Sequence, residues 1–534
     1  MASNTLNISA LSSTELGSLI DSQNAILAAQ GKMLATQGER IAALTHQLDW
    51  FRRQLFGKKS ERFAPEADPA QMYLGELLSI PDKLTEKVKE IAAHTRRVAP
   101  KDGAQSGEEL PFFDESSVPL ESIVLVHEAA KDLQSGEFEL IGEKITYRLS
   151  QRPGSYVILK YRRPVMKRKD TQQILTAAAP AGFLEGSRAD VSFAAGMLMD
   201  KFAWHLPLYR QHQRLAAAGI TVSRPWLTQL AQRSISLLEP IYQAQFASIR
   251  ASRVKTMDET PIKAGRSGHG KMQTGYFWPV YGEQDEVCFP FHPSRAHDFV
   301  ASALGLKAAP DAVLLSDGYG AYQRYAAKIG ITHAQCWSHS RRGFFEALDA
   351  EPDGAASALA QIKAMYAIET QIREKKLAGE TKQIYRLMYS KSLVEHFFAW
   401  VDQQLARQGF TPSNPYIQAL HYVRERRAGL EVFLTDPDVP IDTNHIERAL
   451  RVIPMGRKSW LFCWTELGAK HVGIIQSLIV TCRLHAIDPY TYLVDVLQRV
   501  SVHPASRVTE LTPRLWTQHF ADNPLRSDLH SLPA

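Results

Sequence analysis

The stretch DAVLLSDGYGAY, residues 311–322, contains a short apolar run that ends at Ser316 and Asp317 and is followed by a glycine. A run of this length, bounded by turn residues, is typical of a buried β-strand. The segments before it predict three successive strands and then a helix, at residues 253–264, 275–283, 285–293 and 295–304. The order strand, strand, strand, helix, strand predicts a mixed α/β domain.

Two acidic residues stand out in this α/β pattern. Asp258 lies within the first predicted strand, and Asp317 lies just past the fourth. In a sheet whose first and fourth strands are neighbours, the two carboxylates lie side by side. Like charges at such a distance repel each other and are costly to bury, unless a divalent cation lies between them. Oxygen ligands favour Mg²⁺ or Mn²⁺, so the two acids predict a metal site.

A third acid appears much later, in PIDTNHIERALRVIPMGRKSWLF, residues 440–462. Glu447 lies on a predicted helix, with Asn444 three residues before it and Arg451 four residues after it. This spacing puts all three side chains on one helical face. The residues between the second and third acids, 346–439, predict helices throughout, and we expect them to form an insertion into the α/β domain.

Each acid also has an ordinary explanation. Asp258 could simply end or solvate a strand, and the adjacent Glu259 is an equal candidate on composition. Asp317 could be a turn residue, and Glu447 could pair with Arg451 on a helix surface. Taken together, however, three acids at these positions match the arrangement that metal-dependent phosphodiester chemistry requires.

Residues 206–234 predict two amphipathic helices that flank a turn at Gly219, and Ser223 is a candidate cap for the second helix. The length fits a helix-turn-helix, in which Arg224 would lie near the start of the second helix, where base or phosphate contacts are usually made. Any helical hairpin gives the same pattern, so DNA contact by Arg224 is a hypothesis.

Apolar residues recur at every seventh position from Ile20 to Leu55, which predicts a short, imperfect coiled coil within residues 15–63. One amphipathic helix packed on its own domain explains the spacing equally well. The end of this helix interleaves aromatic residues with cations that are candidates for DNA contact, namely Arg52, Arg53, Lys58 and Lys59. A solvated helix end is the commoner origin of such a run.

Residues 112–178 predict a small, β-rich, basic segment in which Arg162 and Arg163 are candidates for DNA contact. The segment contains no cysteine, which excludes a zinc site built from thiolates. The whole chain has 534 residues, of which 45% are hydrophobic and 22% charged, with a net charge of +6. This composition excludes wholesale disorder and tolerates a polyanionic partner.

Four widely separated cysteines exclude a disulfide framework, and the sequence has no apolar run long enough to cross a bilayer. We therefore expect a cytoplasmic protein. The basic segments suit a polyanionic partner in that compartment, without identifying it.

Four blocks of the chain carry a resemblance to a known family: MDETP with Asp258, LSDGYGAY with Asp317, HAQCWSHSRRGFFEA, and NHIERALRVIPMGRKSWLF with Glu447. They resemble the catalytic core of the DDE-type transposases of the insertion-sequence sixty-six family. Segments near the N-terminus, in the middle and at the C-terminus are similar to that family in the same order. The likeness covers most of the chain.

The resemblance implies a multidomain α/β plus α protein with an RNase H-like catalytic domain and a large α-helical insertion. The expected order is a coiled-coil-like helix (15–63), a linker with a short helix (64–111), the β-rich basic domain (112–178), a helix-turn-helix-like region (179–250), the first part of the catalytic core (251–345), the insertion (346–439), the last part of the core (440–480), and a C-terminal helical element with a tail (481–534).

The resemblance also favours Asp258 over Glu259, and it implies that Asp258, Asp317 and Glu447 bind two Mg²⁺ ions, with Mn²⁺ as a possible substitute and zinc disfavoured. It places Cys336 and His339 near the site as structural residues. A zinc site at this pair would need a second pair of ligands, and the sequence offers none. Further candidates for holding DNA phosphates lie on or after the acidic helix, namely Arg448, Arg451, Arg457 and Lys458, although Arg448 or Arg451 could equally support the helix.

The implied activity is metal-dependent cleavage of DNA at the ends of an insertion sequence, followed by transfer of the 3′ hydroxyl into target DNA. The implied partners are double-stranded DNA in the terminal repeats and the target, other copies of the chain on that DNA, and helper proteins from the same element. A non-catalytic DNA-binding regulator and a nuclease that only hydrolyses DNA remain alternatives. Mg²⁺-dependent nicking and strand-transfer products distinguish them.

Overall fold

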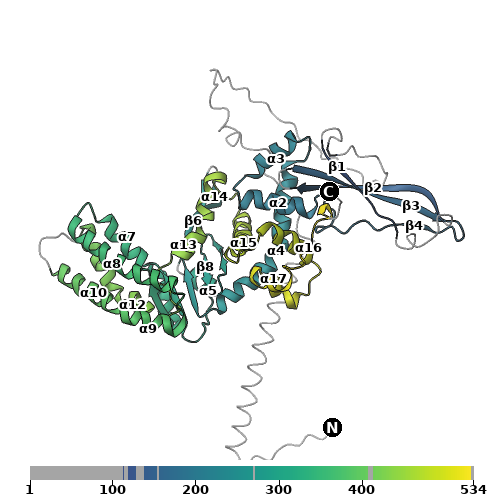
Figure 1. The fold of residues 1–534 in the computed structure, drawn as a ribbon. Helices are drawn as coiled ribbons and strands as arrows, with labels where there is room; N and C mark the ends of the chain where they lie inside the picture. Colours follow the sequence, from purple (N-terminus) through teal and green to yellow (C-terminus); the bar gives the residue numbers. More distant parts are fainter. Residues whose placement is uncertain are drawn as a thin grey trace, which may run out of the picture. The chain divides into compact units, whose positions relative to one another are not determined.

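A computed structural model describes residues 112–113, 118–127, 138–152, 155–268, 271–296, 298–406 and 413–530 (Figure 1). The predicted coiled coil and linker, residues 15–111, therefore lie outside the described residues. The same applies to four of the candidate DNA contacts, Arg52, Arg53, Lys58 and Lys59. The described part is a mixed α/β structure with several sheets, which agrees with the predicted class.

A five-stranded sheet forms the centre of the α/β part, in the order β12-β11-β5-β8-β9. Its strands are β5 (Val254–Met257), β8 (Val280–Gly282), β9 (Val287–Cys288), β11 (Val313–Ser316) and β12 (Thr332–Gln335). β11 pairs in parallel with both β5 and β12, whereas β8 pairs antiparallel with β5 and with β9. The first and fourth predicted strands are therefore neighbours.

Each of the first three predicted strands is broken into two. One half of each belongs to a separate sheet in the order β10-β7-β6, with β6 at Thr260–Gly268, β7 at Lys271–Phe277 and β10 at Phe291–His292. Pro279 and Pro290 lie at two of the breaks, where a proline has no N–H to donate to a continuing ladder. Asp258 consequently lies in the break between β5 and β6, and its predicted position within a strand is wrong.

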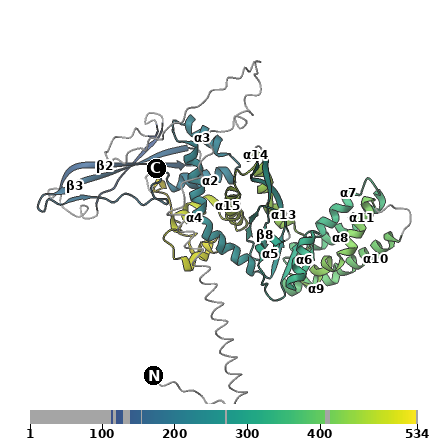
Figure 2. The same ribbon diagram turned by 180° about the vertical axis from the view of Figure 1, so that it is seen from behind.

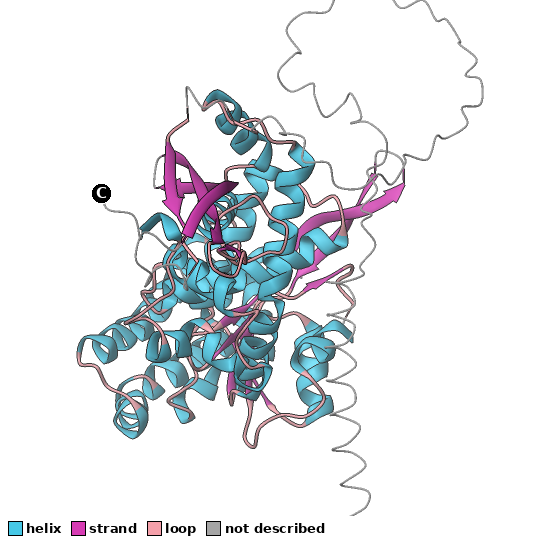
Figure 3. Ribbon diagram, turned by 90° about the vertical axis from the view of Figure 1, so that its right-hand side faces the viewer, coloured by secondary structure: helices cyan, strands magenta, loops and turns pink. Residues whose placement is uncertain are grey.

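Two long helices pack against the sheet and against each other, α4 (Arg224–Ala251) and α15 (Glu466–Leu484). Figure 3 shows strands lying among helices in the described part of the chain. The buried Gln245 amide of α4 donates to the carbonyl of Val287 at 2.9 Å and to the hydroxyl of Thr481 at 3.0 Å, and so joins both helices to β9. These contacts are satisfied polar bonds inside an otherwise apolar core.

The described residues of the predicted α-helical insertion form helices and no strand: α8 (Pro352–Glu374), α9 (Gly379–Tyr389), α10 (Lys391–Leu405), α11 (Pro415–Glu425) and α12 (Arg427–Thr435). They pack with α7 (Trp337–Glu346), which follows β12, and Figure 2 shows α7, α8, α10 and α11 running together. Trp337 is fully buried among their apolar side chains, and its indole N–H donates to the carbonyl of Leu430 at 2.8 Å. Trp337 thereby joins the α/β core to the helices.

The β-rich segment is a four-stranded sheet built around a long antiparallel hairpin (Figure 1). Its strands are β1 (Leu120–Val124), β2 (Phe138–Arg152), β3 (Ser155–Arg168) and β4 (Ile174–Thr176). Val157, Leu159 and Tyr161 of β3 pack with Leu529 from near the C-terminus. The C-terminal part also contributes α16 (Pro489–Arg499) and α17 (Pro513–His519).

The predicted helical hairpin consists of α3 (Leu208–Ala217) and α4, preceded by α2 (Val191–Phe202). Gly219 takes a φ of 78° in the turn, and the Ser223 hydroxyl accepts a hydrogen bond from the Trp226 N–H at 3.3 Å, which confirms the predicted cap. Helix α4 continues to Ala251 and buries much of its length in the core. In the described part of the chain, none of the helices is sufficiently long and apolar to span a bilayer.

Candidate functional site

Asp258 and Asp317 lie at the same edge of the central sheet. Asp258 directly follows β5 and Asp317 directly follows β11, and these two strands run parallel with Leu315 opposite Thr256. Continuing that register by two residues puts the two acids opposite each other, because the carboxyl ends of parallel strands meet at one edge. A backbone N–H holds one oxygen of each: Glu259 donates to Asp258 at 2.7 Å, and Tyr319 donates to Asp317 at 2.9 Å.

Glu447 reaches this edge on the short helix α13 (Asn444–Leu450). Three contacts fix the helix against the sheet. The Thr443 N–H and hydroxyl both donate to the Cys336 sulfur, at 3.3 and 3.2 Å. His445 bonds the Thr256 hydroxyl of β5 at 3.0 Å. Because Cys336 and Thr256 lie at the ends of β12 and β5, these bonds carry the helix to the edge where the other two acids lie.

The charges of the three acids act on one another. The pKa of Asp258 is raised to about 7, chiefly by burial and in smaller part by the negative charges of Glu259, Asp317 and Glu447, against the lowering effect of the Glu259 N–H. Asp317 and Glu447 are thus near enough to Asp258 for their charges to act on it, although both are distant from it in the chain.

The donor chemistry fits a hard divalent cation, since carboxylate oxygens at a site with an excess of negative charge are what Mg²⁺ prefers. In the described part of the chain, no three His, Cys, Asp or Glu side chains are gathered closely enough to hold a metal ion as they stand. Binding a cation would thus require the carboxylates to turn toward one another.

A pH dependence of stability follows for the metal-free protein. The native state holds the Asp258 proton more tightly than the unfolded chain does, because the pKa is raised from 3.8 to about 7. The resulting stabilisation is fully present below pH 4 and is lost as the pH rises through 7. We expect Asp258→Asn to gain about 1–3 kcal/mol in unfolding free energy relative to the parent between pH 4.5 and pH 8.

Urea unfolding in EDTA at a series of pH values measures this difference. Added Mg²⁺ should restore much of the parent's stability at pH 8 and leave Asp258→Asn less affected, since a ligand that binds only the native state stabilises it. Parallel stability curves for the two proteins across this pH range would contradict the prediction.

Glu259, the alternative to Asp258 on composition, is occupied by other partners. Its side chain is only 6% exposed and accepts hydrogen bonds from the Arg295 Nε at 3.0 Å, from a second Arg295 nitrogen and from the Tyr322 hydroxyl. The Arg295 guanidinium also lies over the Tyr319 ring, at 4.4 Å from its centroid. A carboxylate neutralised in this way has less capacity to bind a cation than Asp258 has.

Sequence reasoning did not find Arg295, Tyr319 and Tyr322. Both tyrosines follow Asp317 closely in the chain, within GYGAY, but no local pattern relates them to Glu259. Thr443 also escaped notice, although it directly precedes the acidic helix. Only the contact of its side chain with Cys336 reveals that it helps to place Glu447.

The Cys336 and His339 pair lies beside the acids. Cys336 is buried, and its two bonds from Thr443 are consistent with a structural role. His339 lies 3.8 Å from a Glu447 oxygen, so Glu447 faces this imidazole, and it forms no ion pair with Arg451 among the described residues. His339 and Asp317 both line a cavity of about 370 Å³.

The candidate phosphate contacts fall into separate groups. Arg448, Arg451 and Lys458 are exposed on α13, at its end and on α14 (Val452–Trp460), close in the chain to Glu447, whereas Arg457 is half-buried and donates to the Pro261 carbonyl at 2.5 Å. These three exposed cations therefore lie on the helix of Glu447, at its end or on the helix that follows it.

The remaining three cations lie on other elements. Arg162 on β3 pairs with Glu143 at 2.9 Å, and Arg163 donates to the Ala177 carbonyl at 3.3 Å. Arg224 is exposed at the start of α4, with its guanidinium 5.8 Å from the Tyr209 ring centroid. None of these three contacts involves the acidic edge.

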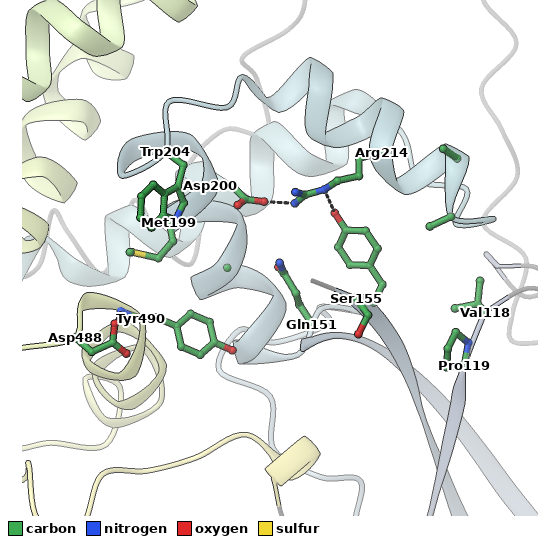
Figure 4. Close-up of a pocket in the computed structure, with 14 residues that line it drawn as sticks. Val118, Pro119, Gln151, Ser155, Met199, Asp200, Trp204, Arg214, Asp488 and Tyr490 are labelled. Carbon is green, nitrogen blue, oxygen red and sulfur yellow. Dashed lines mark hydrogen bonds and ion pairs between the residues drawn. The ribbon is translucent and has the colours of Figure 1, made fainter. Parts of the chain in front are cut away.

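A second, larger cavity of about 670 Å³ lies between the hairpin base, α2, α3 and the start of α16 (Figure 4). Arg214 bonds both Asp200 and the Tyr156 hydroxyl there, the latter at 2.7 Å. Trp204 is 70% exposed at this cavity. None of the predicted site residues lines it, so we do not assign it to the acidic site.

Comparison with known proteins identifies the class. The model of the Transposase IS66 family matches residues 186–471, which is more than half of the chain and includes all three acids. The IS66 C-terminal element matches residues 477–514, and the model described as Transposase C of IS166 homeodomain matches residues 43–111. The chain belongs to the IS66 transposase family, which confirms the resemblance found in its motifs.

Individual relatives span nearly the whole chain. The uncharacterized protein y4hP of Sinorhizobium fredii is 27% identical over 90% of this chain and 89% of its own length. The uncharacterized protein y4jD of the same organism is 27% identical over 86% of this chain and 91% of its own. Membership of the IS66 family implies a role in DNA transposition and, with it, binding to DNA.

Proposed function

We propose that this transposase cleaves DNA at the ends of its insertion sequence and joins the freed 3′ hydroxyl to target DNA, with Asp258, Asp317 and Glu447 as the catalytic acids. The observation that carries the proposal is the convergence of these acids at one sheet edge, where they raise the pKa of Asp258. A cluster of like charges lowers stability in the absence of a cation, so it is expected where a function needs it, as metal-dependent phosphodiester chemistry does.

The topology of the central sheet supports an RNase H-like assignment for the catalytic domain. In chain order, strands one to three form an antiparallel run, β5, β8 and β9, and strands four and five, β11 and β12, add in parallel on the other side of strand one. The helical segment between Asp317 and Glu447 is then an insertion that precedes the acidic helix.

Asp258, Asp317 and Glu447 would hold Mg²⁺, for which Mn²⁺ can substitute, and their oxygen donors make zinc a poor alternative. Bound Mg²⁺ would stabilise negative charge on the attacking and leaving oxygens of the phosphodiester. Thr443 and Cys336 position the helix of Glu447, and Arg295 and Tyr322 keep Glu259 away from the ion. Arg448, Arg451 and Lys458 would bind DNA phosphates beside the acids, while Arg457 supports the helix.

We also propose that the N-terminal region, the hairpin cations Arg162 and Arg163, and Arg224 contribute to binding the terminal repeats. Several copies of the chain would assemble on the two ends, with helper proteins of the same element assisting. Such a protein would act in the bacterial cytoplasm, on DNA of the nucleoid.

The test uses the purified full-length protein and a duplex that carries both terminal repeats of its element. With Mg²⁺ we expect nicks at the repeat ends and joined products when target DNA is present, and EDTA should abolish both. Nicks without joined products would indicate a hydrolytic nuclease. Binding to the ends without any Mg²⁺-dependent nick would indicate a non-catalytic regulator, and either result would overturn the proposal.

A further inference from the structure

The cavity beside Asp317 has walls from two different parts of the chain. Asp317 and Gly318 come from the catalytic edge, while His339 and Arg342 come from α7 and Gln418 and Tyr422 from α11. Its volume is about 370 Å³. A duplex cannot enter a space of this size, but a short piece of one strand can.

The cavity is held in shape by close approaches between α7, α11 and the turn after Asp317. A methyl group on Gly318 would lie only 2.7 Å from the Tyr422 hydroxyl, and one on Gly343 would contact Ala419 at 3.4 Å. The Arg426 guanidinium lies 4.0 Å from the Tyr422 ring centroid and donates to the Gly318 carbonyl at 3.4 Å. Tyr422 is therefore fixed next to the turn that carries Asp317.

An uncommitted cation faces this cavity. Arg342 is exposed, and it forms no ion pair with any residue that the structure describes. Phe345 lies three residues later on α7 and does not line the cavity, but its side chain is 57% exposed and neighbours Arg342 on the helix surface. An arginine next to an open aromatic ring provides a contact for a phosphate and a surface on which a base can stack.

We infer that this cavity is a binding subsite for an unpaired stretch of the DNA strand whose phosphodiester faces the acids. Arg342 binds a phosphate of that strand and Gln418 donates a further hydrogen bond to its backbone, both within the cavity. Phe345, outside the cavity, stacks on a base of the same strand where the strand leaves the cavity. The inference rests on the proposed function and adds the α-helical insertion to the DNA-binding surface. A single strand fits better than a duplex because of the cavity's size and because a stacked base must leave its pair.

The same wall of the cavity also carries a negative charge, so removing a positive or a negative charge from it should change DNA binding in opposite directions. Glu346 also lines the cavity, one helical turn after Arg342, and it is exposed. A phosphate bound at Arg342 is repelled by this carboxylate. Removing the charge of Glu346 should therefore strengthen binding to the unpaired strand, whereas removing the charge of Arg342 should weaken it.

The experiment measures fluorescence anisotropy of the full-length protein with two terminal-repeat DNAs in EDTA, so that no cleavage occurs. One DNA is fully paired, and the other has four unpaired nucleotides at the cleavage site. We expect Arg342→Ala and Phe345→Ala to weaken binding to the unpaired DNA by about 5- to 20-fold, with little change for the paired DNA. Glu346→Gln should tighten it by about 2- to 5-fold.

Arg373→Ala is the matched control, because Arg373 is an exposed arginine of the insertion that does not line the cavity. It should change neither affinity. Arg342→Ala should also lower the slope of log affinity against log salt by about one. Thermal melting of each variant, expected to match the parent because these side chains are exposed, confirms that the proteins are folded.

Equal losses on both DNAs, or Arg342→Ala binding like the parent, would overturn the subsite and leave the proposed function intact. A parent protein that neither binds nor nicks the repeat ends would overturn the proposed function and the subsite together. A weaker complex with Glu346→Gln would show that this carboxylate contributes to binding, which contradicts the phosphate position.

Discussion

Asp258→Asn is expected to reduce Mg²⁺-dependent cleavage of repeat-end DNA by at least about 1,000-fold while end binding stays within about 3-fold of the parent. The acid lies in the break between β5 and β6, opposite Asp317 across two parallel strands, and it interacts with the charges of both other acids. An amide keeps the shape of the carboxylate but removes the charge that attracts a cation. Asp317→Asn and Glu447→Gln should act in the same way.

The matched control is Asp311→Asn. Asp311 is exposed and precedes β11, so the same chemical change is made at the opposite end of that strand, away from the acidic edge. Its cleavage rate should equal that of the parent. Gel analysis of nicked products gives the rate, and anisotropy with the same DNA gives the affinity. Retained cleavage in a purified Asp258, Asp317 or Glu447 variant would remove that residue from the catalytic set.

Gly473→Ala is expected to lower the unfolding free energy by about 2–4 kcal/mol and to reduce the yield of folded protein. Gly473 lies in the buried middle of α15, where an added methyl carbon would be 2.2 Å from the carbonyl oxygen of Phe289. That oxygen belongs to the backbone, so the helix itself must move away. The shift would also break the bond of 2.9 Å from the Phe289 N–H to the Ser477 hydroxyl.

Gly320→Ala serves as the control for this prediction, because a methyl group there meets nothing within 4 Å and the residue begins helix α6 (Gly320–Ile329). Its stability should be equal to the parent's or up to about 1 kcal/mol higher, as alanine favours the helix. Urea unfolding monitored by circular dichroism measures both variants. A Gly473→Ala protein as stable as Gly320→Ala would mean that α15 does not depend on this close approach.

Much of the local structure was predictable from short-range patterns. The apolar run before Asp317 forms β11, the serine before Arg224 caps α4, and the residues between Asp317 and Glu447 form helices. These features depend on side-chain periodicity and on hydrogen bonds between residues a few positions apart. The break at Asp258 was missed, because Pro279 and Pro290 lie at the breaks of the other two predicted strands and affect the first strand only when the strands pair.

The candidate site was predictable in its residue types but not in its surroundings. The three acids follow from chain order and from the resemblance to the family, whereas the partners of Glu259 do not. Arg295 and Tyr322 lie 36 and 63 positions from it in the chain. Nothing in the order of residues distinguishes an occupied carboxylate from an open one, since this difference arises only when distant segments pack.

The identity of the chemical groups was thus readable from the linear chain: which carboxylates, which cations and which helices this transposase contains. Their burial, their partners and the charge that each one carries came from the packed fold, because a pKa or an ion pair depends on distances through space. His445 and Thr256, 189 positions apart, bond at 3.0 Å and so set where Glu447 lies. Folding brings such residues together through long-range burial of the core, which local patterns do not encode.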